Sequence, residues 1–254
     1  MMIFKSTILK GQRILVTGAS SGIGRATSIL LARCGASLVI TGRDQDRLGQ
    51  TLDKLEGSGH QAEVFDLTGE DNIIDFMKML TAGEQPLSGI FHAAGMELVR
   101  GVKLCKAQQV EEVFSSSIKS ALALSRGAAM KGMMVDAGSL VFMSSVAGQR
   151  GQNGMSVYSA AKAAIDGMVR SLAAEFAPRR IRTNSIAAGA IASEMHQRLT
   201  RSLPDNAVKE YETKHLLGFG QTTDIANMVT FLLSDAASWI TGTTIVVDGG
   251  YLAD

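Results

Sequence analysis

The sequence predicts an α/β protein built on a doubly wound, mostly parallel sheet of seven strands with helices on both faces. Two observations lead to this prediction. Short runs of apolar, often β-branched residues alternate with longer stretches whose apolar residues recur at helical spacing. Most short runs are apolar throughout, which is typical of strands covered on both faces. No internal repeat or low-complexity linker interrupts the pattern, so residues 1–254 are expected to form a single domain.

The expected elements alternate between strand and helix along most of the chain. Strands are expected at residues 13–17, 37–41, 62–65, 89–93, 139–143, 181–187 and 243–247. Helices are expected at residues 23–34, 45–55, 73–80, 110–130, 156–176 and 222–233. Gly35 and Pro178 follow the ends of two of these helices, as terminating residues commonly do. Residues 190–221 are the least regular part, and they are expected to form either a lid over a substrate or a plain pair of surface helices.

Composition and charge exclude several classes of protein. The 254 residues carry a formal net charge of +1, and 46% of them are hydrophobic. This balance gives no electrostatic footprint for nucleic acid or an anionic membrane, and no apolar run is long enough to span a bilayer. The N-terminus shows no secretory signal, and two isolated cysteines, Cys34 and Cys105, fit neither a disulfide framework nor a metal site. We therefore expect a cytoplasmic protein without a metal.

A glycine-rich turn follows the first expected strand and opens the first helix. It reads TGASSGIG over residues 17–24 and has the spacing GxxxGxG. Glycines allow the main chain to approach a pyrophosphate, and a helix N-terminus offers free N–H groups and a positive dipole. The turn is expected to bind dinucleotide phosphates, although a simple strand-to-helix turn would show the same pattern. The residues expected to contact the cofactor here are Gly18, Ser20, Ser21, Gly22, Ile23 and Gly24.

The end of the second strand bears on the choice of dinucleotide. A carboxylate there would bond a ribose 2′-hydroxyl and repel a 2′-phosphate, but that place holds Gly42, and Arg43 follows it. Because a guanidinium suits a phosphate, NADP(H) is favoured as the cofactor and NAD(H) is the alternative. Asp44 is expected either to cap the next helix or to weaken phosphate binding.

A hydroxyl, a phenol and an ammonium group are candidates for catalysis at Ser145, Tyr158 and Lys162. Tyr158 and Lys162 are four residues apart, so a helix places them on one face. The ammonium is expected to lower the pKa of the phenol from its ordinary value of ~10, while Ser145 holds a carbonyl oxygen that Tyr158 protonates. On its own, an amphipathic helix with a half-buried tyrosine and a solvated lysine would show the same spacing.

Taken together, these residues resemble the short-chain dehydrogenase/reductase family in its short, single-domain form. The resemblance runs from about Gly11 to Gly250 and includes RTNSIAAGAIAS at 182–193 and ITGTTIVVDGG at 240–250. It implies a Rossmann-type fold and hydride transfer between a nicotinamide and a carbonyl or secondary alcohol. As a whole, the sequence is similar to those of 3-oxoacyl-carrier-protein reductases and related ketone reductases. A homodimer or homotetramer is also implied. The resemblance adds these cofactor contacts: Asp66, Leu67, Ala93, Ala94, Gly95, Tyr158, Lys162, Gly189, Ile191 and Ser193.

The chain departs from the family pattern at three places. Ser117 stands where the family usually carries an asparagine in its proton relay, so it is either a weaker relay member or an ordinary helix serine. His92 replaces an asparagine at the end of the fourth strand, where it either has a structural role or titrates near neutrality. Ala188 replaces a proline, and Ser193 replaces a threonine.

Two functions follow from this sequence. The first is an NADP-dependent reductase of a small or acyl-linked carbonyl compound, with Ser145, Tyr158 and Lys162 as catalytic residues and Ser117 as a doubtful fourth. The second is a cofactor-binding protein with little turnover, a sensor or a partner subunit, and Ser117 and His92 are its only support.

Overall fold

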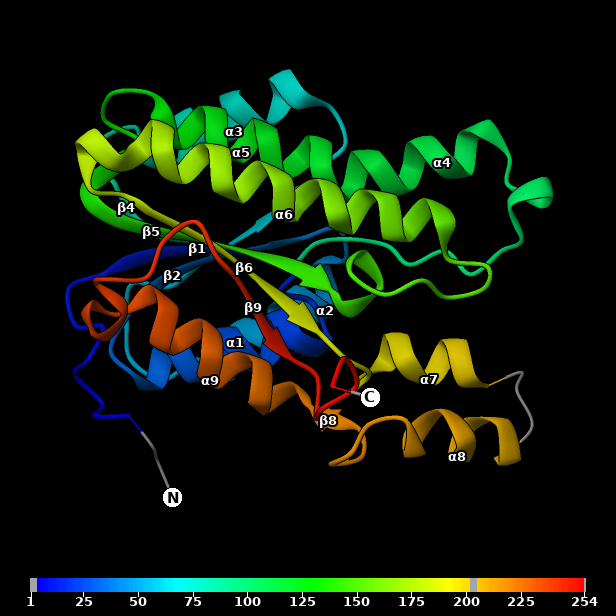
Figure 1. Ribbon diagram of the computed structural model, residues 1–254. Coiled ribbons are helices and arrows are strands. Elements are labelled where there is room, and N and C mark those ends of the chain that lie inside the picture. Colours follow the sequence, from blue (N-terminus) through cyan, green and yellow to red (C-terminus); the bar gives the residue numbers. More distant parts are fainter. Residues whose placement is uncertain (1–3, 202–204, 254) are drawn as a thin grey trace.

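The protein is a three-layer α/β structure, seen here in a computed structural model that describes residues 4–201 and 205–253 (Figure 1). Within these residues, seven parallel strands form one sheet in the order β3-β2-β1-β4-β5-β6-β9. The strands are β1 (Arg13–Thr17), β2 (Ser37–Gly42), β3 (Gln61–Val64), β4 (Leu87–His92), β5 (Met134–Ser145), β6 (Arg182–Ala188) and β9 (Thr244–Val247). The doubly wound, Rossmann-type fold class predicted from the sequence is confirmed.

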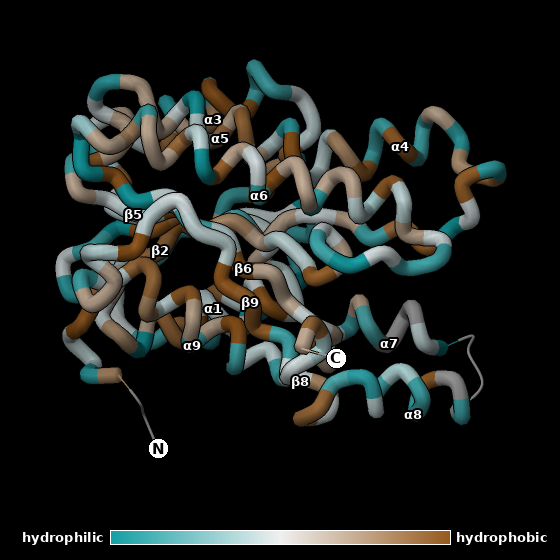
Figure 2. Tube along the Cα trace, viewed as in Figure 1, coloured by the Kyte–Doolittle hydropathy of each residue, from teal (hydrophilic) through white to brown (hydrophobic). Residues whose placement is uncertain are grey.

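Helices cover both faces of the sheet. One face carries α3, α5 and α6, and the other carries α1, α2 and α9 (Figure 1). The helices are α1 (Gly22–Arg33), α2 (Gln45–Leu52), α3 (Glu70–Thr81), α4 (Ala107–Phe114), α5 (Ser120–Ala129), α6 (Ser156–Phe176), α7 (Glu194–Thr200), α8 (Asp205–Thr213) and α9 (Thr222–Leu233). The strands are mostly apolar while α8 is mostly polar, as the hydropathy colouring shows (Figure 2). None of the described helices is long and apolar enough to cross a membrane.

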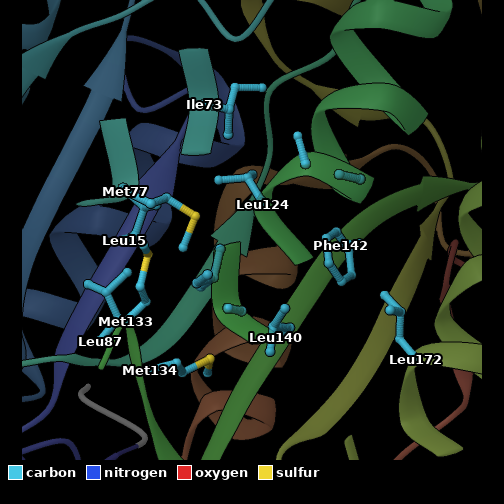
Figure 3. Packing of buried hydrophobic residues seen from close by; sticks show 14 of the residues in the cluster. Leu15, Ile73, Met77, Leu87, Leu124, Met133, Met134, Leu140, Phe142 and Leu172 are labelled. Atoms are coloured by element: carbon cyan, nitrogen blue, oxygen red, sulfur yellow. The ribbon is translucent and has the colours of Figure 1, made fainter. Parts of the chain in front are cut away.

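Each face of the sheet has its own hydrophobic core. Ile73, Met77 and Leu124 belong to the first core, where α3 and α5 pack against β5 residues such as Phe142 (Figure 3). Leu31 and Leu232 belong to the second core, on the face that α1 and α9 cover. Burial of apolar surface stabilises by roughly 25 cal/mol per Å², so these two cores fix the sheet as a rigid base for the loops at its edge.

The strand order reverses direction between β1 and β4. The connections that follow β1 and β4 run in opposite directions along the sheet. They leave a crevice at the carboxyl ends of the two strands. Thr17 pairs with His92 at the last register position, so the turns that follow β1 and β4 lie side by side. The glycine-rich turn and residues 93–95 therefore share the place where ligands bind in doubly wound sheets.

Two features differ from the expected elements. The helix expected at 110–130 is interrupted by one π-helical turn, Ser115–Lys119, between α4 and α5. The hydroxyl of Ser116 donates to the main-chain oxygen of Glu112 at 2.8 Å, and such competition within a serine run perturbs the helical hydrogen-bond ladder. Strand β5 begins five residues early because a register shift lets Met134 pair with Leu87.

Residues 190–221 form the helix pair that was one of the two expectations, while a lid over a substrate stays a prediction. Helices α7 and α8 are a helix pair, and two short strands, β7 (Ile191–Ala192) and β8 (Gly220–Gln221), tie the segment's ends together. The short strands were not predicted because two residues carry no periodicity. Side chains of α7 and α8 also line the cavity described below, as a lid would. Leu203, which belongs to this segment, lies outside the described residues.

Candidate active site

A cavity of about 610 Å³ lies at the carboxyl ends of the central strands. Its walls come from the first turn of α1, the segment after β4, the ends of β5 and β6 with the residues that follow them, the start of α6, and helices α7 and α8. Among the predicted site residues, the cavity is lined by Ile23, Ala93, Gly95, Ser145, Tyr158, Lys162, Gly189, Ile191 and Ser193. The structure thus brings the three candidate catalytic residues to one cavity.

Ser145 is placed by the end of a central strand. Residues 139–145 of β5 pair in register with residues 182–188 of β6, which fixes the strand end. The Ser145 hydroxyl oxygen accepts a hydrogen bond from the Ala147 N–H at 3.2 Å. It also hydrogen-bonds the phenol of Tyr158. Ser145 therefore holds a defined position beside Tyr158.

Tyr158 and Lys162 both project from the first turns of α6. The ammonium of Lys162 donates to the main-chain oxygen of Met143 at 2.8 Å, and the side chain is buried. Its nitrogen lies 5.5 Å from the centre of the Tyr158 ring. The helical spacing therefore places the phenol and the ammonium together, as the sequence predicts.

The expected lowering of the Tyr158 pKa is wrong for this structure. Burial raises the pKa of Tyr158 above its ordinary value, and the carboxylate of Glu97 raises it further. The hydrogen bond from Ser145 opposes this shift without reversing it. Burial also lowers the pKa of Lys162 to about 8, which weakens the cation that the prediction relied on. The phenol consequently stays protonated at neutral pH.

Glu97 is an acidic residue of the cavity that the sequence reasoning missed. It follows β4 by five positions and lines the cavity together with Tyr158 and Lys162. Burial raises the pKa of Glu97 to about 7, and Lys162 partly opposes the rise. Nothing in the sequence around position 97 signals a site, because a lone glutamate in a loop is usually solvated.

The glycine-rich turn has the shape of a phosphate cradle. Gly18 has a positive φ of 66°, and a Cβ atom there would lie 2.9 Å from the Ala94 nitrogen. A Cβ atom on Gly24 would lie 2.3 Å from the Gly18 oxygen. Only glycine fits these two positions, and the first turn of α1 then presents its N–H groups to the crevice. These residues fit a dinucleotide pyrophosphate.

Arg43 and Asp44 follow β2 at the rim of the crevice. The Asp44 carboxylate caps α2 by accepting a hydrogen bond from the Arg47 N–H at 3.0 Å, which favours the capping role over interference with a phosphate. Arg43 is exposed and has neither a hydrogen bond nor an ion pair to the described residues. A Cβ atom on Gly42 would lie 3.1 Å from the Ser20 hydroxyl, so the strand end leaves little room for a carboxylate side chain.

Several other predicted cofactor contacts lie outside the cavity lining. Asp66 is exposed and accepts a hydrogen bond from the Thr68 N–H at 3.2 Å, whereas the side chain of Leu67 is buried in the first core. Gly189, by contrast, lines the cavity, and it lies so close to Asp248 that a Cβ atom would come within 2.8 Å of the Asp248 Cα. The predicted residues outside the lining are Gly18, Ser20, Ser21, Gly22, Gly24, Arg43, Asp66, Leu67, Ala94 and Ser117.

His92 belongs to a buried chain of hydrogen bonds. The Ala94 N–H donates to the Thr17 hydroxyl at 3.1 Å, and Thr17 Oγ1 lies 2.8 Å from His92 Nδ1. On the other side, His92 Nε2 lies 3.0 Å from the Ser120 hydroxyl, which donates to the Ser117 carbonyl. These partners assign the ring proton to Nε2. Burial lowers the pKa of His92 to about 3, so the structural role is favoured and titration near neutrality is wrong.

Ser117 is neither a solvated serine nor one that bonds back to its own helix. Its hydroxyl is buried, and it finds no hydrogen-bond partner among the described residues. An orphaned buried hydroxyl costs about 1–3 kcal/mol, so it is a place for a bound water or a ligand group. Its part in a proton relay stays a prediction from the sequence.

The comparisons with known proteins agree with this geometry. The family described as "Enoyl-(Acyl carrier protein) reductase" matches residues 18–252. The 3-oxoacyl-[acyl-carrier-protein] reductase FabG of Rickettsia conorii is 33% identical over 96% of this chain and 98% of its own. A tropinone reductase homolog of Arabidopsis thaliana is 34% identical over 96% and 90% of the two chains.

A solved structure shows the same architecture. The short-chain type dehydrogenase/reductase from Mycobacterium ulcerans superposes with a TM-score of 0.87 and 30% identity, covering 96% of this chain and 91% of its own. The fold, the candidate active site and the relatives all indicate the same family. The chain therefore belongs to the short-chain dehydrogenase/reductase family, whose members are oxidoreductases acting on carbonyl and CH–OH groups.

Proposed function

We propose that this protein is an NADP-dependent reductase that transfers a hydride between the nicotinamide and a ketone or secondary alcohol. One observation carries the proposal: Ser145, Tyr158 and Lys162 line a single cavity that opens beside the glycine-rich turn. A dinucleotide on that turn would extend its nicotinamide toward the same cavity. A 3-oxoacyl thioester belongs to the substrates to be tested first, because a FabG reductase is among the similar proteins.

The three residues divide the work of ketone reduction. The Ser145 hydroxyl holds the substrate oxygen. The Tyr158 phenol donates its proton to that oxygen, and its raised pKa keeps it in the acid form needed for reduction. Lys162, fixed by the Met143 oxygen, would hold the nicotinamide ribose. The bound cofactor supplies the hydride.

Arg43 supports NADP(H) over NAD(H). Its guanidinium is exposed and has no partner among the described residues, and it follows the strand end that carries no carboxylate. A 2′-phosphate would gain a charge-assisted hydrogen bond there. The phosphate cradle itself suits either dinucleotide.

A carbonyl panel tests the proposal. Purified protein is titrated with NADPH and with NADH while nicotinamide fluorescence is followed, and turnover is then measured on 3-oxoacyl thioesters, cyclic ketones and hydroxy ketones. We expect binding that favours NADPH and oxidation of NADPH by at least one ketone. Binding without turnover on any compound would instead support the cofactor-binding protein with little turnover.

Assembly into a homodimer or homotetramer is also part of the proposal. The outer face of α6 exposes small residues, Ala160 and Ala163, and α5 exposes Leu122, so a second copy could approach closely. Light scattering coupled to size exclusion would show whether the mass exceeds that of one 26.9 kDa chain. A cytoplasmic location remains a prediction from the sequence.

A further inference from the structure

The cavity contains a carboxylate that has no hydrogen-bond partner among the described residues. Glu97 lines the cavity, and it forms no hydrogen bond and no close ion pair with any described residue. Its charge nevertheless acts on its surroundings, because it raises the pKa values of both Tyr158 and Tyr211. A half-buried carboxylate without a donor is costly, so this position favours a ligand that supplies a donor or a positive charge.

Aromatic side chains form another wall of the same cavity. His196 of α7 and Tyr211 of α8 both line it. Their rings pack on Phe219, with centroid distances of 4.6 Å for His196 and 5.8 Å for Tyr211. Tyr211 also packs edge-on against Tyr251 at 6.1 Å, so its ring is held in place. Aromatic faces attract cations, and a nearby carboxylate adds to that attraction.

Lys162 offsets the charge of Glu97 only in part, because burial still raises the pKa of Glu97 to about 7. The ionisable residues of the lining are Glu97, Tyr158, Lys162, His196 and Tyr211. Lys162 is bound to the Met143 oxygen. Burial lowers the pKa of His196, so its ring is mostly neutral at neutral pH. A substrate carboxylate or phosphate would therefore meet a like charge, without a free cation among the lining side chains that the structure describes.

We propose that the carbonyl substrate carries an ammonium group, which Glu97 binds electrostatically while the aromatic rings of His196 and Tyr211 cover it. The proposal rests on the proposed ketone reductase function and narrows its substrate class to amino ketones and amino alcohols. Glu97 is a substrate-binding residue in this proposal, and the proton of the reduction still comes from Tyr158.

Three cyclic ketones of similar shape test the proposal. They are 1,1-dimethyl-4-oxopiperidinium, a permanent cation; 4,4-dimethylcyclohexanone, its neutral isostere; and 4-oxocyclohexanecarboxylate, an anion. Values of kcat/KM are measured with NADPH at about pH 8, where Glu97 is mostly ionised because its pKa is about 7. The ratio of cation to neutral ketone is compared between variants, so the intrinsic reactivity of each ketone cancels.

Glu97→Gln removes the charge and keeps the shape. We expect it to lower the cation-to-neutral ratio by about tenfold or more and to raise the anion-to-neutral ratio. Glu175→Gln is the matched control: this exposed glutamate lies near the far end of α6, and the variant should keep the wild-type ratios. An unchanged cation-to-neutral ratio in Glu97→Gln would overturn the proposal, while reduction of the neutral ketone would leave the reductase function standing.

Binding gives a second readout that needs no turnover. Calorimetry compares 4-hydroxy-1,1-dimethylpiperidinium with 4,4-dimethylcyclohexanol on the protein, with and without NADP⁺. We expect the cation to bind wild type about tenfold more tightly and to lose this advantage in Glu97→Gln. Equal affinities in wild type would overturn the inference even if no ketone were reduced. Failure to bind NADPH would count against the reductase function alone.

Discussion

The ammonium nitrogen of Lys162 lies 5.5 Å from the centre of the Tyr158 ring, inside a buried part of the cavity. Burial lowers the pKa of Lys162 to about 8 from an ordinary 10.5. A lysine whose pKa is lower in the folded state costs stability while it is charged in both states. That cost is fully present below about pH 8 and is relieved as the pH rises toward about 10.5.

Lys162→Met should therefore stabilise the protein while it abolishes turnover. We expect the free energy of unfolding at neutral pH to rise by about 1–2 kcal/mol, less than the full shift because the hydrogen bond to Met143 is lost. The gain should shrink between about pH 8 and 10.5. Urea unfolding across this range measures it, with the exposed Lys54→Met as the control. A loss of stability at neutral pH would contradict the prediction.

Tyr158→Phe tests the proton donor directly. The variant keeps the ring and removes the hydroxyl that hydrogen-bonds Ser145. We expect turnover at saturating cofactor to fall by about 10²–10⁴-fold, because general acid catalysis contributes that much. Cofactor affinity, followed by nicotinamide fluorescence, should change little. Retention of more than about a tenth of the turnover would assign the proton to another group.

The meeting of the three candidate catalytic residues could be predicted because their placement depends on regular structure. Helical spacing puts Tyr158 and Lys162 on one face of α6, and the parallel order of β5 and β6 brings Ser145 to the same edge of the sheet. Glu97 could not be predicted in this way, because a loop residue has no period that assigns its direction.

The direction of the Tyr158 pKa shift could not be predicted from the sequence, for a related reason. The spacing of Tyr158 and Lys162 is local, whereas burial depends on every element packed around the cavity. The π-helical turn at Ser115–Lys119 and the two-residue strands β7 and β8 arise likewise from tertiary contacts and leave no periodic pattern. Sequence therefore predicted which groups meet, and the structure was needed for their electrostatics.

His92 gives the protein an acid-sensitive core. Burial lowers its pKa to about 3 from an ordinary 6.5, so the folded protein keeps it neutral while the unfolded chain takes up a proton. Stability is therefore lost as the pH falls from about 6.5 toward 3, by up to about 1.4 kcal/mol per pH unit.

His92→Asn should remove this pH dependence. Denaturant unfolding is measured at about pH 8 and about pH 5 for wild type and variant. At about pH 8 His92 is neutral, so the difference in unfolding free energy between wild type and variant reports the lost hydrogen bonds to Thr17 and Ser120. We expect wild type to lose more stability than the variant on acidification. Parallel losses in the two proteins would show that His92 does not govern the slope.

Gly18 and Gly49 should respond in opposite ways to alanine. At Gly18 the φ is 66° and a Cβ atom would meet the Ala94 nitrogen at 2.9 Å, so Gly18→Ala should destabilise by about 1–3 kcal/mol and weaken cofactor binding. Gly49 lies within α2 with nothing within 4 Å of its Cβ position, so Gly49→Ala should stabilise by about 0.5–1 kcal/mol. Thermal unfolding of both variants checks the contrast. Equal effects at the two positions would contradict the close approach of the two turns.

Arg43 should decide between the two dinucleotides. Its guanidinium is exposed, has no partner among the described residues, and follows a strand end that carries Gly42 in place of a carboxylate. Arg43→Ala should therefore weaken NADPH binding by about 10–100-fold, the effect of losing one or two charge-assisted hydrogen bonds, and should leave NADH binding nearly unchanged. Fluorescence titrations with both cofactors measure this.

Arg33→Ala is the control for that experiment, because Arg33 is exposed and pairs with Glu56 at 2.8 Å. It should change neither affinity. Rising salt should narrow the NADPH preference of wild type, since an exposed charge pair is screened over about 10 Å at 0.1 M ionic strength. If Arg43→Ala weakened the binding of NADPH and NADH equally, Arg43 would contact a group that the two cofactors share. The preference for NADP(H) would then need another cause.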